Sequence, residues 1–193
     1  MNGFRAIFSN KSAVACLLAN ILVSVSWQGV YFFVISFIKE RYSVATGFAA
    51  LIYSIMSAGY TVGSMVSGKY VNRLGRKPAT IFGVIALSLC TIVAMNPPSY
   101  LICIVVSVLG PFVGAFRAVG GNSLMLEQVP EYRGAVMSMN QAANWLGTAI
   151  GTGFGSVFLV AYGWGVFGLT LGVLGFISAG IFQLLVIDPT ASH

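Results

Sequence analysis

Charged residues are scarce in this sequence. Only 7% of its 193 residues are charged and 58% are apolar, whereas a soluble domain has roughly one charged residue in four. A chain of this size with so few polar residues could not cover the surface of a water-soluble core. The composition therefore predicts a membrane protein that is surrounded mainly by the lipid bilayer.

The residues that build metal centres and hydrolytic active sites are also scarce. The one histidine is His193, and the three cysteines, Cys16, Cys90 and Cys103, lie apart from one another in apolar segments. Metal sites and buried Ser–His pairs need such residues in suitable patterns, and the apolar segments contain no general base. We therefore expect no metal, no cofactor and no enzymatic activity, which argues against an intramembrane hydrolase.

The net charge of +6 is compatible with nucleic-acid binding. However, the lysines and arginines stand at the ends of apolar segments and do not form a continuous basic face with interleaved aromatic residues. We therefore expect no nucleic-acid partner.

Six apolar segments are long enough to cross a bilayer as helices, which takes about 20 residues. Helices are expected because a membrane-spanning helix satisfies its own backbone hydrogen bonds. The breaks between the segments are short and contain charged, proline or glycine residues. We therefore expect one all-α domain over residues 1–193, with transmembrane helices at approximately residues 12–38, 45–67, 79–95, 100–126, 135–162 and 165–187.

The lysines and arginines of the short connections predict the orientation, because these residues are in excess on the cytoplasmic side of a membrane. One side holds Arg5, Lys11, Lys69, Arg73, Arg76, Lys77 and Arg133, and the other holds Lys39 and Arg41. We therefore expect a multi-pass protein of the plasma membrane with both termini in the cytoplasm.

The most basic segment is GKYVNRLGRKP at residues 68–78, between the second and third predicted helices. Its glycines permit a tight turn with positive φ, and its arginines stand where helix-end carbonyls and acidic groups can accept their hydrogen bonds. The pattern resembles the signature loop of the major facilitator superfamily, G-x-x-x-D-R-x-G-R-R/K. The matching residues are Gly68, Asn72, Arg73, Gly75, Arg76 and Lys77. In that family the loop helps to latch the two halves of a transporter, and Asn72 in place of the usual Asp is expected to weaken the ionic part of the latch.

The resemblance implies a transporter built from two six-helix halves, of which this chain supplies one. The segments FRAIFSNKS, at residues 4–12, and VPEYRGAVMSMNQAANWLGTAIG, at residues 129–151, look like parts of the C-terminal half of an efflux permease. The partner is then an N-terminal half or a second copy of the chain in parallel orientation. The expected function is transport of a small molecule by alternating access. The alternative is an inert or regulatory membrane subunit, or a decayed transporter remnant.

Polar residues inside the predicted helices mark a candidate substrate cavity, because such residues are costly in a membrane. They recur at helical spacing in the first and fifth helices. These candidates are Asn20, Ser24, Trp27, Gln28 and Tyr31, together with Asn140 and Asn144. The resemblance places the first helix of a half along the central cavity. The alternative for these residues is an interhelical seam of hydrogen bonds that does not touch a substrate.

Arg117 is the one charged residue well inside a predicted helix. It lies nine residues before Leu126, so about 13 Å separates it from the helix end, which is too far for its side chain to reach water easily. It could bind an anionic substrate or pair with a carboxylate of the other half. The alternative is a structural hydrogen bond to helix-end carbonyls.

Glycines recur at four-residue steps in two of the predicted helices. They are Gly59 and Gly63 in the second helix and Gly147, Gly151 and Gly155 in the fifth. Such spacing allows two helix backbones to approach closely. We expect these glycines to be packing positions and not ligand contacts.

All four acidic residues lie at the ends of predicted helices: Glu40, Glu127, Glu131 and Asp188. A proton-coupled carrier usually needs a buried carboxylate whose pKa is shifted by its surroundings. For proton coupling, that carboxylate would have to come from the other half, or Glu127 and Glu131 would have to act at the cytoplasmic mouth.

Overall fold

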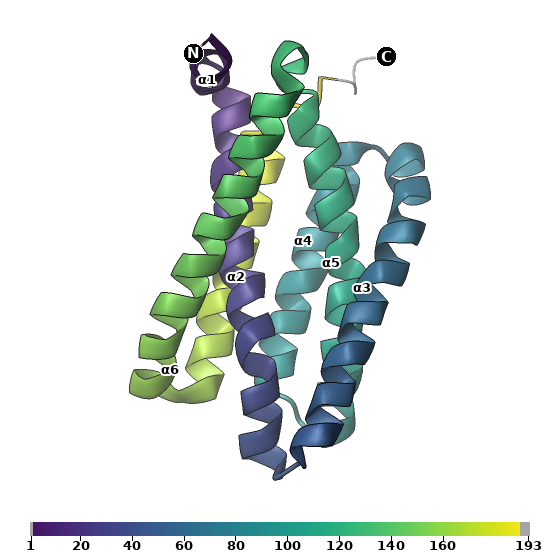
Figure 1. Ribbon diagram of the computed structural model, residues 1–193, viewed down its shortest axis with the longest axis vertical. Coiled ribbons are helices and arrows are strands. Elements are labelled where there is room, and N and C mark those ends of the chain that lie inside the picture. The colour runs from purple at the N-terminus through teal and green to yellow at the C-terminus, as the bar shows by residue number, and fades with distance from the viewer. Residues whose placement is uncertain (1, 190–193) are drawn as a thin grey trace.

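The computed structural model describes residues 2–189, which form helices joined by short connections (Figure 1). The helices are α1 (Asn2–Ser9), α2 (Lys11–Tyr42), α3 (Thr46–Leu74), α4 (Arg76–Met95), α5 (Tyr100–Leu126), the 3-10 helix η1 (Pro130–Tyr132) and α6 (Arg133–Leu184). Five helices, α2 to α6, are long and apolar enough to cross a membrane by length and composition. The expectation of an all-α protein is confirmed for the described residues.

α6 takes the place of the fifth and sixth predicted helices. It spans 52 residues, but Gly163 has φ 75° and ψ 177°, a conformation that does not occur in a right-handed helix. The chain reverses there, so that residues 133–162 run along the bundle in one direction and residues 164–184 return beside them (Figure 1). Glycine suits this position because a side chain disfavours positive φ.

The helices also differ in length from the predicted spans. α2 continues to Tyr42 and carries Lys39 and Arg41 in its last turn, where positive charge is favourable beside the free carbonyls. α3 continues to Leu74, and α1 has no counterpart among the predicted helices. The predicted boundaries follow hydropathy, which shows where a segment stops being apolar. A helix ends where its backbone hydrogen bonds end, and this point can lie several residues further along the chain.

The long helices form two groups, which differ in their closest neighbours. α2 packs along α6, while α3 and α4 both pack along α5. α4 also packs against α6, and this contact joins the two groups, whereas α2 touches α3 and α5 only sparingly. α3 lies at the edge of the bundle in Figure 1 and is the least covered of the long helices.

The two ends of the bundle differ in charge. Figure 1 shows that α1, the α3–α4 connection, η1 and the end of α6 lie at one end, and the α2–α3 connection and the reversal at Gly163 lie at the other. The helix order therefore puts the lysines and arginines expected on the cytoplasmic side at the end with α1. Lys39 and Arg41 lie at the opposite end.

Glycines are found where helix backbones approach most closely. A Cβ atom on Gly147 or Gly151 would lie 2.6 Å or 2.5 Å from a carbonyl oxygen of α2, and one on Gly63 would lie 2.5 Å from a carbonyl oxygen of α5. Gly59 and Gly155 also lie at interhelical contacts. In lipid, helices associate through such close packing, because burial from water no longer drives them together.

Gly151→Ala tests this close approach. The added methyl group would lie 2.5 Å from the carbonyl oxygen of Val25, so that α2 and α6 must separate. We expect the free energy of unfolding to fall by about 1–3 kcal/mol. The measurement is thermal unfolding of the purified protein in mild detergent. Gly153→Ala is the matched control, because an added Cβ there meets nothing within 4 Å. Equal effects of the two substitutions would contradict the packing role.

Candidate functional site

Arg117 lies well inside α5, and its backbone packs directly against α4. A Cβ atom on Gly83 of α4 would lie 2.5 Å from the amide nitrogen of Arg117 and 3.0 Å from its Cα. Only glycine at position 83 leaves room for this contact. The side chain of Arg117 extends toward α2 and α6, where all its hydrogen-bond acceptors are found.

Nη2 of Arg117 makes the hydrogen bonds of the guanidinium group to the described residues. It lies 3.0 Å from Oδ1 of Asn20, 3.2 Å from Oδ1 of Asn144 and 3.3 Å from Oγ of Ser24, with the carbonyl oxygen of Asn20 at 3.4 Å. Every one of these acceptors is neutral. Nε is buried without a hydrogen-bond partner. Within residues 2–189 the positive charge of Arg117 therefore has dipoles around it but no counterion.

Behind the guanidinium group, side chains from α2, α5 and α6 bond to one another. Nδ2 of Asn20 donates to Oδ1 of Asn140 at 2.7 Å, and Nδ2 of Asn140 donates to Oδ1 of Asn122 at 2.8 Å. Oγ of Ser24 donates to Oδ1 of Asn144 at 2.8 Å. Asn20 and Asn140 are only 2% and 1% exposed. These two residues form an interhelical seam and do not line a cavity.

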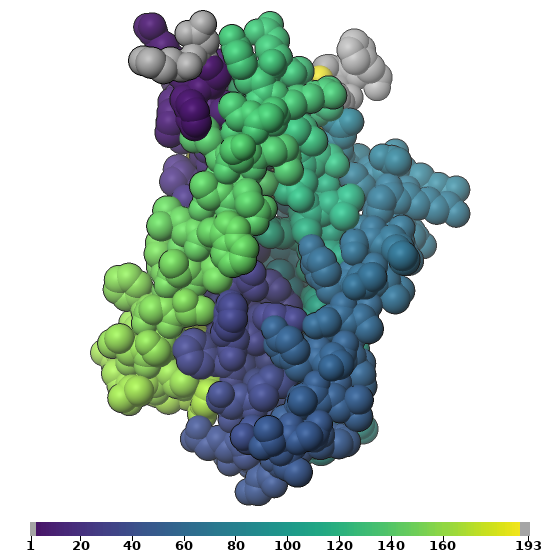
Figure 2. Space-filling model, in the orientation of Figure 1, coloured from purple at the N-terminus to yellow at the C-terminus, as the bar shows by residue number. Residues whose placement is uncertain are grey.

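In front of the guanidinium group lie two cavities, of about 460 Å³ and 200 Å³, which share part of their walls. Figure 2 shows the surface hollowed between α6 and α3. Both cavities are lined by Trp27, Gln28, Tyr60, Arg117 and Ala118. The larger one extends toward Tyr31, Ser57 and Thr61, and the smaller one toward Ser24, Gln141 and Asn144.

The predicted cavity residues line these cavities, with the exception of Asn20 and Asn140. Ser57, Tyr60 and Thr61 of α3 are wall residues that the prediction did not include. The available signal was the spacing of hydroxyl residues in α3. The hydroxyl groups of Ser57 and Thr61 donate to carbonyl oxygens four residues earlier in their own helix, which lets such residues occur in an apolar helix.

The basic segment at residues 68–78 is almost entirely helical. Gly68, Asn72 and Arg73 lie in the last turns of α3, and Arg76 and Lys77 begin α4. Gly75 between them has φ 92° and ψ 154° and makes the turn. The expectation that both glycines serve a loop is therefore wrong, because Gly68 lies inside a helix and one glycine is enough for the turn.

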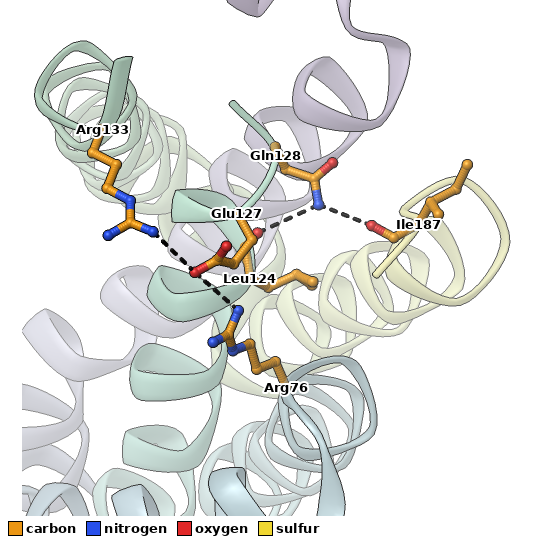
Figure 3. A network of polar contacts seen from close by, with 6 residues as sticks. All are labelled: Arg76, Leu124, Glu127, Gln128, Arg133 and Ile187. Atoms are coloured by element: carbon orange, nitrogen blue, oxygen red, sulfur yellow. Dashed lines mark hydrogen bonds and ion pairs between the residues drawn. The ribbon is translucent and has the colours of Figure 1, made fainter. Parts of the chain in front are cut away.

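An ion-pair cluster connects the start of α4 to the end of α5 and the start of α6 (Figure 3). Nη1 of Arg76 lies 3.1 Å from Oε1 of Glu127, and Nη2 of Arg133 lies 3.6 Å from the same oxygen. The contact of Arg76 has the distance of an ion pair without the alignment of a hydrogen bond. Arg76 of the basic segment thus contacts an acid of its own helix bundle.

Two further side chains bind backbone carbonyls near the end of α6. Nε2 of Gln128 donates to the carbonyl oxygen of Ile187 at 2.9 Å (Figure 3), and Nζ of Lys77 donates to that of Gln183 at 2.9 Å. The positive charge of Lys77 is favourable there because the last carbonyls of a helix carry partial negative charge. The ends of four helices, α4 to α6 and α2 through its cap residue Asn10, are connected at this corner.

A family model described as Major Facilitator Superfamily matches residues 16–193. The chain belongs to the major facilitator superfamily. No curated protein matches the chain significantly. The matched residues include all the helices around Arg117, and the superfamily consists of membrane transporters and not of enzymes.

Glu127→Gln tests the ion-pair cluster. The substitution leaves Arg76 and Arg133 without the shared carboxylate, whose side chain is 22% exposed. We expect the free energy of unfolding to fall by about 1 kcal/mol, and by less at high salt, because ions screen the attraction. Thermal unfolding in mild detergent at two salt concentrations measures this effect.

Glu131→Gln is the control for this experiment, because Glu131 is exposed and makes no ion pair with the described residues. A loss of stability that is the same for both substitutions, or that does not change with salt, would speak against the cluster.

Proposed function

We propose that the chain is one half of a secondary transporter and that a small molecule passes through the cavities at Arg117. The observation that carries this proposal is a polar cavity inside an apolar bundle, in a chain that belongs to a superfamily of transporters. Polar groups inside a membrane are costly unless they bind one another or a ligand. The amide of Gln28 lines both cavities and makes no hydrogen bond to residues 2–189, so it is free to bind a substrate.

α3 offers a surface for the second six-helix half. Its small residues recur at spacings of three and four along one face, which is the pattern of a helix–helix contact. They are Gly47, Ala50, Ser54, Ser57, Thr61, Ser64 and Gly68. The middle of this stripe lines the larger cavity, whereas a Cβ atom on Gly47 or Gly68 would meet nothing within 4 Å. We therefore propose that the second half contacts α3 near Gly47 and near Gly68, at the two ends of this stripe. Between these contacts it would cover the opening of the cavity.

The second half is an N-terminal half or another copy of this chain. Halves related by an axis along the membrane normal have the same orientation in the bilayer, so that both arrangements are geometrically allowed. The resemblance of residues 129–151 to efflux permeases supports a role as the C-terminal half.

We further propose that the protein lies in the plasma membrane with the α1 end in the cytoplasm. The support is the excess of lysine and arginine at that end. Lys39 and Arg41 are the basic residues of the other end.

The cavity walls include no Asp or Glu among the described residues. This half alone therefore offers no carboxylate in the cavity that could bind a coupled proton. Glu127 is paired with Arg76 and Arg133. If a proton drives transport, we therefore propose that the second half supplies the buried carboxylate.

Gln28→Cys tests access to the cavity without knowledge of the substrate. Alternating access opens the cavity to each side of the membrane in turn. We therefore expect a charged, membrane-impermeant thiol reagent to modify this cysteine in both right-side-out and inside-out vesicles. The extent of modification is measured by mass spectrometry. The chain without the substitution gives the background labelling of Cys16, Cys90 and Cys103.

Val173→Cys is the control for sidedness, because Val173 is 51% exposed on the returning arm of α6, where lipid is expected. Its thiol should remain unmodified from either side, since a thiolate does not form in lipid. Modification of Gln28→Cys from one side only, or from neither, would favour an inert or regulatory subunit over a transporter.

The protein mass of the purified particle in mild detergent tests the second half. Two chains would support a second copy as the partner, and one chain would favour a separate N-terminal half. In the complete assembly, whichever it is, we expect Ser64→Leu to weaken association, because the larger side chain separates helices that meet over small residues. Met65→Leu is the matched control, since Met65 is 79% exposed on a different face of α3. Equal association of the two variants would rule out the stripe as the contact.

A further inference from the structure

We propose that the substrate of this cavity is an amphipathic organic anion whose anionic group binds Arg117. The inference rests on the proposed transport function and names the substrate class for the same site. Three features of the described part of the chain, residues 2–189, support it: the charge of Arg117 has no counterion there, aromatic side chains line the larger cavity, and no carboxylate there competes for Arg117.

Arg117 has hydrogen-bonding capacity that the protein does not use. A guanidinium group carries five N–H donors in a planar fork that matches a carboxylate. In this structure Nη2 makes the hydrogen bonds, and the buried Nε has no partner within residues 2–189. Nη1 makes no hydrogen bond to residues 2–189 and is not among the buried atoms without a partner. An anionic ligand in the cavity would therefore accept from Nη1 and supply a counterion.

The acceptors that surround Nη2 favour an anion over a neutral substrate. The amide oxygens of Asn20 and Asn144 and the hydroxyl oxygen of Ser24 orient the guanidinium group but do not neutralise it. A neutral sugar or amide would leave the full positive charge uncompensated. A cationic substrate would be repelled at close range, where the surrounding apolar helices strengthen electrostatic interactions.

No acid of the chain competes for this position among the described residues. Glu127 lies ten residues after Arg117, which is about 15 Å along the helix, and it is paired with Arg76 and Arg133. Within residues 2–189, the walls of the two cavities contain neither Asp nor Glu. The cavity therefore has one positive charge and room for one anionic group.

The remaining walls suit an apolar body. The rings of Trp27 and Tyr31 are 5.6 Å apart, and those of Tyr31 and Tyr53 are 4.8 Å apart. Trp27, Tyr31 and Tyr60 line the larger cavity, whose volume of about 460 Å³ is within the range of small-ligand sites. Aromatic side chains of this kind pack against aromatic or aliphatic groups. The ligand is therefore expected to carry a ring or a chain beside its anionic group.

Protection of a cysteine in the cavity tests the proposal directly. Thr61→Cys places a reporter on the wall of the larger cavity, at a hydroxyl whose hydrogen bond, among the described residues, is to the carbonyl oxygen of Ser57 in its own helix. The purified full chain in mild detergent is treated with a neutral maleimide, in the presence of naphthoate or of naphthamide, which have the same ring system. We expect naphthoate to slow the modification at a concentration about tenfold lower than naphthamide, because the interaction with Arg117 is charge-assisted.

Asn144→Asp separates charge recognition from shape. The new carboxylate would lie about 3.2 Å from Nη2 of Arg117, where the amide oxygen lies now, and it would act as an internal counterion with almost no change in volume. We expect the preference for naphthoate to disappear while protection by naphthamide remains. Arg117→Gln should have the same effect on the preference. Arg41→Gln removes an exposed charge at the far end of α2. It should change neither the preference for naphthoate nor the protection by naphthamide.

Each outcome decides the proposal. Equal protection by the two probes, or none by naphthoate up to its solubility limit, would overturn it and favour a carboxylate of the second half as the partner of Arg117. A preference that persists in Asn144→Asp would also overturn it, and this variant decides the question even if Arg117→Gln fails to fold. If the preference for naphthoate is lost in Asn144→Asp, the anion site is supported. If Gln28→Cys is at the same time modified from one side of the membrane only, the anion site stands but the transport function is overturned.

Discussion

The close approach of α2 and α6 at Gly147 and Gly151 is the contact on which the rest of the site depends. Because these glycines have no side chain, the backbone of α6 lies directly against carbonyl oxygens of α2. At this separation, short polar side chains reach across the interface: Ser24 donates to Asn144 at 2.8 Å. Larger residues in place of the glycines would move these partners out of hydrogen-bonding range. The acceptors that surround Arg117 are therefore positioned by backbone packing.

The α4–α5 contact brings the guanidinium group to these acceptors in the same way. Gly83 allows the backbone of Arg117 to lie against α4, and Gly120, one turn further along α5, lies against Thr80. A charged side chain in the middle of a membrane costs at least about 2.5 kcal/mol. The neutral acceptors offset part of this cost without removing the charge. Arg117 thus keeps its positive charge without a counterion among the described residues, which is the arrangement that the proposed anion site requires.

The spacing of polar residues in the sequence was sufficient to predict the wall of the cavity that α2 forms. It was not sufficient to predict the other walls. The four-residue spacing of Asn20, Ser24 and Gln28 follows from helix geometry, which predicted that they share a face. Spacing within one helix contains no information on the neighbouring helix, so the pairing of Asn20 with Asn140 could not be foreseen. For the same reason Tyr60 of α3 was missed, since nothing in its own helix shows that it lies opposite Arg117.

The fold was predictable to a similar extent. Hydropathy identified the apolar segments, because lipid imposes a minimum length on each of them. It could not show that the helix continues through most of the basic segment, since the turn depends on the backbone of a single residue, Gly75. The reversal within α6 is also made by one glycine, Gly163, and its exact geometry is a property of φ and ψ that composition does not encode.

The arrangement of the helices connects the site to movement of the bundle. α2 and the first arm of α6 carry the acceptors, α5 carries Arg117, and these two groups are joined mainly where α4 meets the returning arm of α6. At that junction a Cβ atom on Gly172 or Gly175 would overlap side chains of α4, so the two helices are in direct contact there. The direct contact between α2 and α5 is sparse. A rotation of one group against the other about the α4–α6 junction would therefore change the distances from Arg117 to Asn20 and Asn144. Such a rotation would weaken the hydrogen bonds of Arg117 to Asn20 and Asn144. An anion bound to Arg117 would replace them, so that ligand binding would lower the free-energy cost of the rotation.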